Sequence, residues 1–167
     1  IATSGDTQLG GDDFDELIIN DVMKHHDKSK LTAGDKRALR TLAKQVREKL
    51  TDHSRAVFQI SLSDGLHIDQ NFPRNHFENI AKDLVNRSLD RIKQTLRDAS
   101  LDVKDIKGVV MVGGATRMPV IRNMVADFFK QEPLINLNPD EVVALGAALQ
   151  ANLLAGNRGA DDAWLLL

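Results

Sequence analysis

The spacing of hydrophobic residues divides the chain into helical and extended stretches. After a Gly-rich, acidic loop at residues 5–14, apolar residues recur every three or four positions, and they do so again at 36–50, at 76–100 and from residue 120 onward, which predicts four amphipathic helices. The predicted buried faces are Phe14, Leu17, Ile18 and Val22; Leu39, Leu42, Ala43, Val46 and Leu50; Phe77, Ile80, Leu84, Leu89, Ile92 and Leu96; and Val120, Ile121, Met124, Val125 and Phe128.

One stretch has the period of a strand instead. Residues 57–63 alternate between polar and apolar side chains, and Asp64-Gly65 follows them directly. An Asp-Gly pair between two extended runs is a strong signal for a tight hairpin turn. The sequence therefore predicts a hairpin whose second strand begins at "LHID".

The apolar run at residues 109–112 ends on the pair Gly113-Gly114. Such a run suits a parallel strand that is covered on both faces, and ligands of open α/β sheets bind beyond the carboxyl ends of these strands. Because glycine lacks a Cβ, a flat or anionic ligand can approach the backbone closely at this pair. The run predicts a buried strand that leads into a ligand-binding turn.

The residues after the glycine pair can form either a ligand-binding turn or a plain strand-to-helix turn. Thr116 is expected to cap the next helix, Pro119 suits its first turn, and the free N–H groups there attract phosphate. The guanidinium of Arg117 can stack on an aromatic base. The alternative is a plain strand-to-helix turn with a solvated arginine, and the local residues leave both open.

The last predicted helix starts at "NPDE". Asn138 can serve as N-cap, Pro139 fits the first helical position and Glu141 completes a capping box. The body that follows, "VVALGAALQANLLA", is apolar nearly all round, which predicts a buried helix.

Composition excludes several classes of function. The 22 basic and 24 acidic residues give a net charge of -2, so we expect no nucleic-acid or membrane partner. There is no cysteine, and the five histidines have no metal-ligand spacing, so we expect no metal site of the protein's own. No apolar run approaches the roughly 20 residues that span a bilayer, and no secretory signal is visible. We expect a cytoplasmic location.

Three motifs in this order resemble the DnaK-type, 70-kDa heat-shock chaperone family: "LGGDDFD", "VVMVGGATRMP" and "NPDEVVALGAALQ". The resemblance covers essentially the whole chain. It implies lobe II of the family's ATPase domain, with an α/β, actin-like (ribonuclease-H-like) fold: a mixed sheet with flanking helices, plus a small helix-and-hairpin subdomain. Residues 1–160 would form the lobe, about 25–107 the subdomain, and 161–167 the start of the interdomain linker with Leu165, Leu166 and Leu167.

The resemblance also implies a nucleotide site. Gly10 and Gly11 would lie near the ribose and phosphates, and the turn at 113–118 would form the wall beside the adenosine. The full set is Gly10, Gly11, Lys44, Arg47, Glu48, Thr51, Gly113, Gly114, Ala115, Arg117, Met118 and Asp140. The face of the 36–50 helix departs from the family, which often presents Glu, Lys, Arg or Ile, and Ser there. Lys44 and Glu48 differ in charge from this pattern, whereas Arg47 and Thr51 are close replacements, and the alternative for all four is a solvated helix face.

The implied ligand is ATP or ADP with Mg²⁺, the metal being held mainly by the phosphates and by lobe I. Because the catalytic groups of the family belong to lobe I, the resemblance implies that this chain alone has no catalytic residue and does not hydrolyse ATP at a useful rate. The implied partners are lobe I and the peptide-binding domain of the same parent chain, a J-domain co-chaperone, and an unfolded or scaffold-protein client. The edge beside residues 109–112 would also favour self-association.

Other interpretations remain. The short hairpin and the ending "LLAGNR…LLL" are more similar to the HscA-like branch, which serves iron–sulfur cluster assembly, although a general chaperone could shorten its hairpin independently. The alternatives from other classes are a non-enzymatic module that binds a regulatory partner without nucleotide, and another actin-like kinase, against which the NPDE helix start argues.

Overall fold

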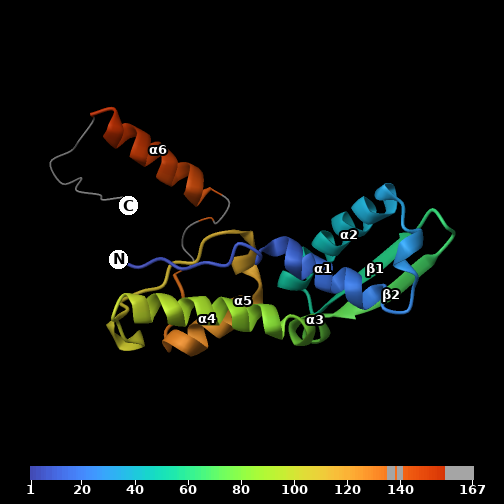
Figure 1. Cartoon of the computed structure of the whole chain (residues 1–167), viewed down its shortest axis with the longest axis horizontal. Helices are drawn as coiled ribbons and strands as arrows, with labels where there is room; N and C mark the ends of the chain where they lie inside the picture. Colours follow the sequence, from blue (N-terminus) through green and yellow to red (C-terminus); the bar gives the residue numbers. More distant parts are fainter. Residues whose placement is uncertain (135–137, 139–140, 157–167) are drawn as a thin grey trace.

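The computed structural model describes residues 1–134, 138 and 141–156. The helices and strands within them follow one another as α1 (Gly11–Val22), α2 (Ala33–Asp52), β1 (Arg55–Ser61), β2 (His67–Pro73), α3 (Arg74–Ile80), α4 (Lys82–Asp98), α5 (Pro119–Phe129) and α6 (Val142–Leu154), with short 3-10 turns η1 (Lys28–Lys30), η2 (Val103–Asp105) and η3 (Gly114–Arg117). Figure 1 shows α1, α2 and the hairpin at one end, α4 and α5 side by side at the other, and α6 apart from both.

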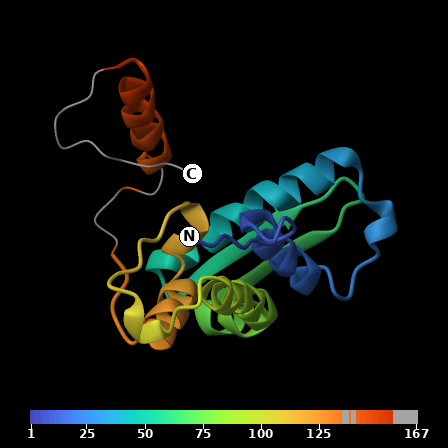
Figure 2. The same ribbon diagram turned by 60° about the vertical axis from the view of Figure 1, so that its left-hand side comes forward.

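Helices α1 and α2 pack on each other and on the hairpin, as Figure 2 shows. The predicted faces are confirmed: Phe14, Ile18 and Leu39 are almost fully buried, and Leu17 is partly so. Helix α2 begins earlier than the hydrophobic spacing indicates, because the Thr32 hydroxyl accepts the backbone N–H of Asp35 and caps it. Local capping therefore sets the start of this helix.

The predicted hairpin is also confirmed. β1 and β2 pair antiparallel, with Ser61 opposite His67, and Gly65 in the turn has a φ of 88°. Ala56 and Phe58 on β1 are buried against α2, while Val57 on the other face is exposed. The period of two read from the sequence thus places one face of the hairpin in the core.

Asp35 joins the start of α2 to the hairpin. Its carboxylate accepts the backbone N–H and hydroxyl of Ser63 and the backbone N–H and hydroxyl of Thr32. These bonds, those of Ser63 above all, hold the pKa of the Asp35 carboxyl well below its usual range. The hairpin turn is therefore anchored by a carboxylate and by apolar packing together.

The long helix predicted at 76–100 is two helices. α3 and α4 are separated at the buried Ala81, and Ser100 closes α4 with a φ of 55°. Phe77 is buried and the remaining predicted positions of this face are half-buried, while the buried Val85 joins them. The break lets α3 follow the hairpin while α4 packs on α5.

The prediction of a strand buried on both faces at residues 109–112 is wrong for this structure. In the described residues the segment makes one parallel bridge, Val110 to Leu134, and the sheet is the two-stranded β1–β2 hairpin. Val110 and Val112 are 54% and 43% exposed. The physical reason is that a parallel strand needs paired neighbours and covering layers on both faces. In place of the mixed sheet expected from the family resemblance, the described residues contain the antiparallel hairpin and this one parallel bridge.

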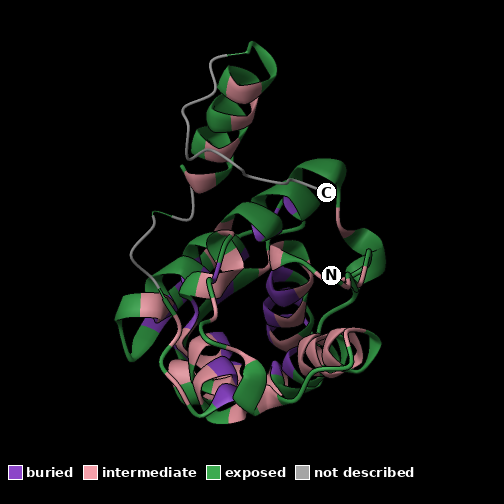
Figure 3. Cartoon of the chain, turned by 90° about the vertical axis from the view of Figure 1, so that its left-hand side faces the viewer, coloured by how far each residue is buried: buried purple, intermediate pink, exposed green. Residues whose placement is uncertain are grey.

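The prediction that the last helix is buried is also wrong here. Among the described residues of α6 none is buried, and Leu149 and Leu154 are 67% and 77% exposed. Figure 3 shows the same contrast: buried positions line the inner sides of the other helices, and α6 carries none. An apolar helix is buried only where another element covers it.

Two predicted caps differ as well. α6 begins after Glu141 without a side-chain cap, and Asn138 contributes its backbone carbonyl, which accepts the N–H groups of Glu141 and Val142. Pro139 lies outside the described residues. The Thr116 hydroxyl donates to the Gly113 carbonyl instead of capping α5, because Thr116 lies within η3 and Met118 takes the N-cap position of α5. The expectation that Pro119 lies in the first turn of α5 is confirmed.

No helix within 1–134 or 141–156 has both the length and the apolar character needed to cross a bilayer.

Candidate functional site

The first predicted part of the site is the N-terminus of α1. Gly10 precedes the helix with extended backbone, and its N–H donates to the Asp13 carboxylate at 2.7 Å. Asp12 adds a second carboxylate to the first turn. Phosphate is attracted to free N–H groups and repelled by such acids, whereas hydroxyl groups can donate to them. This end of α1 is therefore better suited to the hydroxyls of a sugar than to a phosphate.

The second part is the face of α2. The ammonium of Lys44 lies 3.9 Å from the carboxylate of Glu48, and both side chains are exposed. Arg47 is buried, with its Nε 2.6 Å from Oδ1 of Asp15 and its Nη2 3.3 Å from Oδ2. Lys44 and Arg47, the two cations among the predicted site residues of α2, are thus each paired with a carboxylate.

The third part is the turn at 113–118. Gly113 has a φ of 96°, a conformation that side-chain-bearing residues rarely adopt, and it starts the turn η3. A Cβ on Gly114 would meet no atom within 4 Å, so this glycine borders open space. Ala115 is half-buried in the same turn. The turn leaves its backbone accessible beside Gly114, as a close-approaching ligand requires.

The ends of this turn differ in burial. Met118 is 2% exposed and anchors the turn in the core. Arg117 is exposed, and its Nη2 donates to the side-chain oxygen of Asn138 at 3.3 Å. This bond connects the second family motif to the start of the third. Asp140 and the predicted linker residues Leu165, Leu166 and Leu167 lie outside the described residues.

The three parts meet at Arg47. A Cβ placed on Gly11 would lie 3.5 Å from Nη2 of Arg47, so the guanidinium lies against the start of α1. Arg47, Thr51 of the same helix and Met118 of the turn also border one gap between packed side chains. The structure therefore brings together residues from the first motif, from the α2 face and from the second motif.

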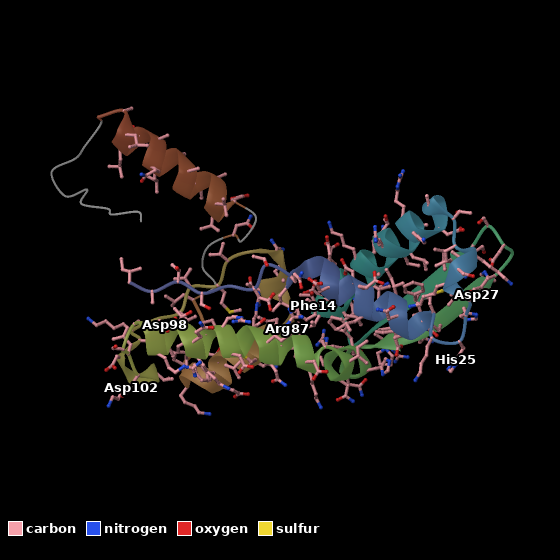
Figure 4. The ribbon with its side chains drawn as sticks, viewed as in Figure 1. Phe14, His25, Asp27, Arg87, Asp98 and Asp102 are labelled. Carbon is pink, nitrogen blue, oxygen red and sulfur yellow. The ribbon has the colours of Figure 1, made fainter. Side chains whose placement is uncertain are left out.

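The stretch before α1 is held along α4. Arg87 of α4 donates to the carboxylate of Asp6 at 2.7 Å and to the carbonyl of Gln8 at 3.2 Å. The N–H of Gln8 and the guanidinium of Arg87 both lower the pKa of Asp6. Figure 4 shows Arg87 on α4 beside this stretch, with Phe14 at the start of α1. The loop that leads into Gly10 is therefore positioned by a charged pair.

Sequence reasoning missed Asp15 and Arg74. Asp15 precedes Ile18 and Ile19 by three and four positions, so it lies on the buried face of α1, where an unpaired carboxylate would be costly. That spacing was the available signal for a buried cationic partner. Arg74 donates to the carbonyls of Leu50 and Thr51 and so caps the carboxyl end of α2. No local sequence pattern predicts this contact.

Across the described residues, no group of three or more acidic or histidine side chains is placed to hold a metal ion.

The described residues thus combine a helix that begins after Gly10, two ion pairs that involve α2, and a glycine turn. The family described as Hsp70 protein matches residues 1–166. The chain therefore belongs to the Hsp70 family.

Individual relatives are similar over the whole chain. It is 55% identical over 167 residues to a protein of Bordetella pertussis named chaperone protein HscA homolog. Proteins with the same name from Laribacter hongkongensis and Methylobacillus flagellatus are 52% and 49% identical, over 100% and 99% of the chain. In each case the chain spans 27% of the relative's length.

Proposed function

We propose that the chain is lobe II of the ATPase domain of an Hsp70 chaperone and supplies the adenosine-binding half of its nucleotide site. The observation that carries the proposal is the meeting at Arg47 of three segments that the family resemblance assigns to one site. In this proposal residues 1–160 form the lobe, with the helix-and-hairpin subdomain at about 25–107, and residues 161–167 begin the interdomain linker.

The charges support a division of labour within the site. On α2 the cations Lys44 and Arg47 are paired with acids, and the first turn of α1 is acidic. Because the cations among the site residues are compensated by acids, we assign the neutral nucleoside end of ATP or ADP to this chain. The phosphates and Mg²⁺ then depend on groups of lobe I, and phosphoryl transfer needs groups from both walls. The isolated chain is therefore inactive as an ATPase.

In the whole protein the cycle is one of client-peptide binding and release driven by ATP, with a J-domain co-chaperone as partner. The names of the relatives support the HscA-like branch, and with it a scaffold-protein client of iron–sulfur cluster assembly. A lobe that binds a regulatory partner without nucleotide is the competing function, and ADP titration separates the two.

The test is Gly114→Val in the full-length protein. A Cβ at this position meets no atom within 4 Å and the backbone has no left-handed φ, so the substitution fits the folded chain. We expect ADP binding, measured by calorimetric titration, to be lost while the thermal unfolding midpoint is kept. Gly5→Val is the matched control, because Gly5 also borders open space and lies outside the site. Unchanged ADP affinity in a folded Gly114→Val variant would contradict the proposal.

A further inference from the structure

A buried ion pair links α1 to α2 beside the proposed site. The side chains of Arg47 and Asp15 are 9% and 7% exposed, and two hydrogen bonds join the guanidinium to the carboxylate side-on. A bidentate contact of this kind fixes the plane of the guanidinium as well as its position. Arg47 therefore has one orientation, although a free arginine has many rotamers.

The pair leaves one nitrogen of the Arg47 guanidinium outside its two hydrogen bonds. Asp15 accepts one hydrogen each from Nε and Nη2, and a Cβ on Gly11 would lie in ordinary van der Waals contact with Nη2, at 3.5 Å. The remaining nitrogen, Nη1, is not used by the pair. Since guanidinium cannot lose its proton, Nη1 is always a donor. A donor with a fixed direction costs little entropy when it binds a nucleoside acceptor.

From this geometry we propose that Asp15 is a positioning residue for nucleotide binding. It holds the Arg47 guanidinium beside Gly11 so that Nη1 is presented to adenosine. The inference rests on the proposed function and deepens it, because it states which end of the nucleotide Arg47 recognises.

The alternative is that the Asp15–Arg47 pair has a purely structural role and only joins α1 to α2. The two roles differ in their ligand dependence. If Asp15 only joins the helices, its loss changes stability and affects all ligands alike. If Asp15 aims Arg47 at adenosine, its loss weakens ADP but not pyrophosphate, which has no nucleoside.

The experiment compares Asp15→Asn with wild type in the full-length protein, using calorimetric titration with ADP and with pyrophosphate. Asn keeps one acceptor oxygen but neither the charge nor the second acceptor, so we expect ADP to bind about tenfold more weakly and pyrophosphate to bind unchanged. Asp21→Asn is the matched control. Asp21 also lies on α1 and pairs with another helix, through His76 of α3 at 2.8 Å, so we expect it to leave both affinities unchanged.

Arg47→Met and the double variant Asp15→Asn/Arg47→Met complete a cycle. If Asp15 acts through Arg47, the double variant binds ADP no more weakly than Arg47→Met alone. The double variant also guards against misfolding, because removing both charges avoids an uncompensated buried ion. Equal losses for ADP and pyrophosphate, additive losses in the double variant, or unchanged ADP affinity in Asp15→Asn would each overturn the inference.

The outcome for wild type separates this inference from the proposed function. Wild-type protein that binds ADP, with Asp15→Asn unaffected, overturns the positioning role alone. Wild-type protein that does not bind ADP overturns the proposed function and the positioning role with it.

Discussion

Two regions of the molecule contain similarly apolar sequences but differ in burial: the first is α1, α2 and the hairpin, and the second is the 109–112 segment together with α6. In the first, Phe58 and Ile18 are completely buried, Asp15 is paired with Arg47, and the Asp35 carboxylate accepts hydrogen bonds from Ser63 and Thr32. In the second, Val110 is half exposed and the side chains of α6 lie open. The comparison teaches that apolar character determines which residues can be buried, while burial itself requires a partner surface.

The difference lies in how many layers each region has. α1 and α2 pack on one another, and α2 packs on β1, so each apolar face meets another. The segment at 109–112 has one bridge, to Leu134, and α6 has no comparable partner within the described residues. The first region forms a core with apolar faces on both sides, whereas the second carries exposed apolar side chains.

The largest expected effect is at the centre of the core of the first region. Phe58→Ala removes a fully buried ring between the hairpin and α2, and such truncations cost about 3–5 kcal/mol. Val57→Ala, one residue away on the exposed face, should change the free energy of unfolding by less than about 0.5 kcal/mol. Urea unfolding followed by circular dichroism measures both. Equal costs would mean that the hairpin has no buried face.

A second effect concerns the anchor of the hairpin. Asp35→Asn loses the charge-assisted bonds to Ser63 and Thr32, so we expect a thermal midpoint several degrees lower at pH 7. Because the folded pKa is lowered, the contribution of Asp35 is fully present above its unfolded pKa of about 3.9 and is lost as the pH falls below that value. The gap between wild type and variant should therefore narrow below about pH 4. A gap independent of pH would exclude the carboxylate as its cause.

A smaller effect tests the glycine turn. Gly113 has a positive φ, so Gly113→Ala should cost about 1–2 kcal/mol through backbone strain alone. Gly114→Ala should cost almost nothing, because its backbone is ordinary and a Cβ there meets no neighbour. Chemical unfolding distinguishes the two glycines. A larger loss at Gly114 than at Gly113 would refute the described turn.

The smallest effect is expected on α6. Leu149 is 67% exposed, so Leu149→Gln should alter the unfolding free energy of this chain by less than about 0.5 kcal/mol. It should also reduce self-association, seen in sedimentation velocity, since it removes part of an exposed apolar surface. A loss above about 2 kcal/mol would show that α6 is packed in solution and would break the contrast between the two regions.

Much of the fold follows from local pattern. The faces of α1, α2 and α5, the alternation of the hairpin and the Asp64-Gly65 turn were all readable, because side-chain period is a property of each element by itself. The family resemblance could be found from three short motifs because each motif is one contiguous run of residues. Of the candidate site residues, Gly11 and Met118 were named from these motifs, and Arg47 and Thr51 from the helix face that the family resemblance implies.

What the tertiary structure decided is which of these local possibilities found a partner. The apolar character of residues 109–112 and of α6 predicted that both are buried, but burial depends on surfaces outside those runs. Likewise, in the sequence of α2 Arg47 is one charged residue among several, and in the sequence of α1 Asp15 is an acid on the apolar face. Only packing of the two helices makes them a fixed pair, because a contact between residues 32 positions apart leaves no periodic signal in either segment.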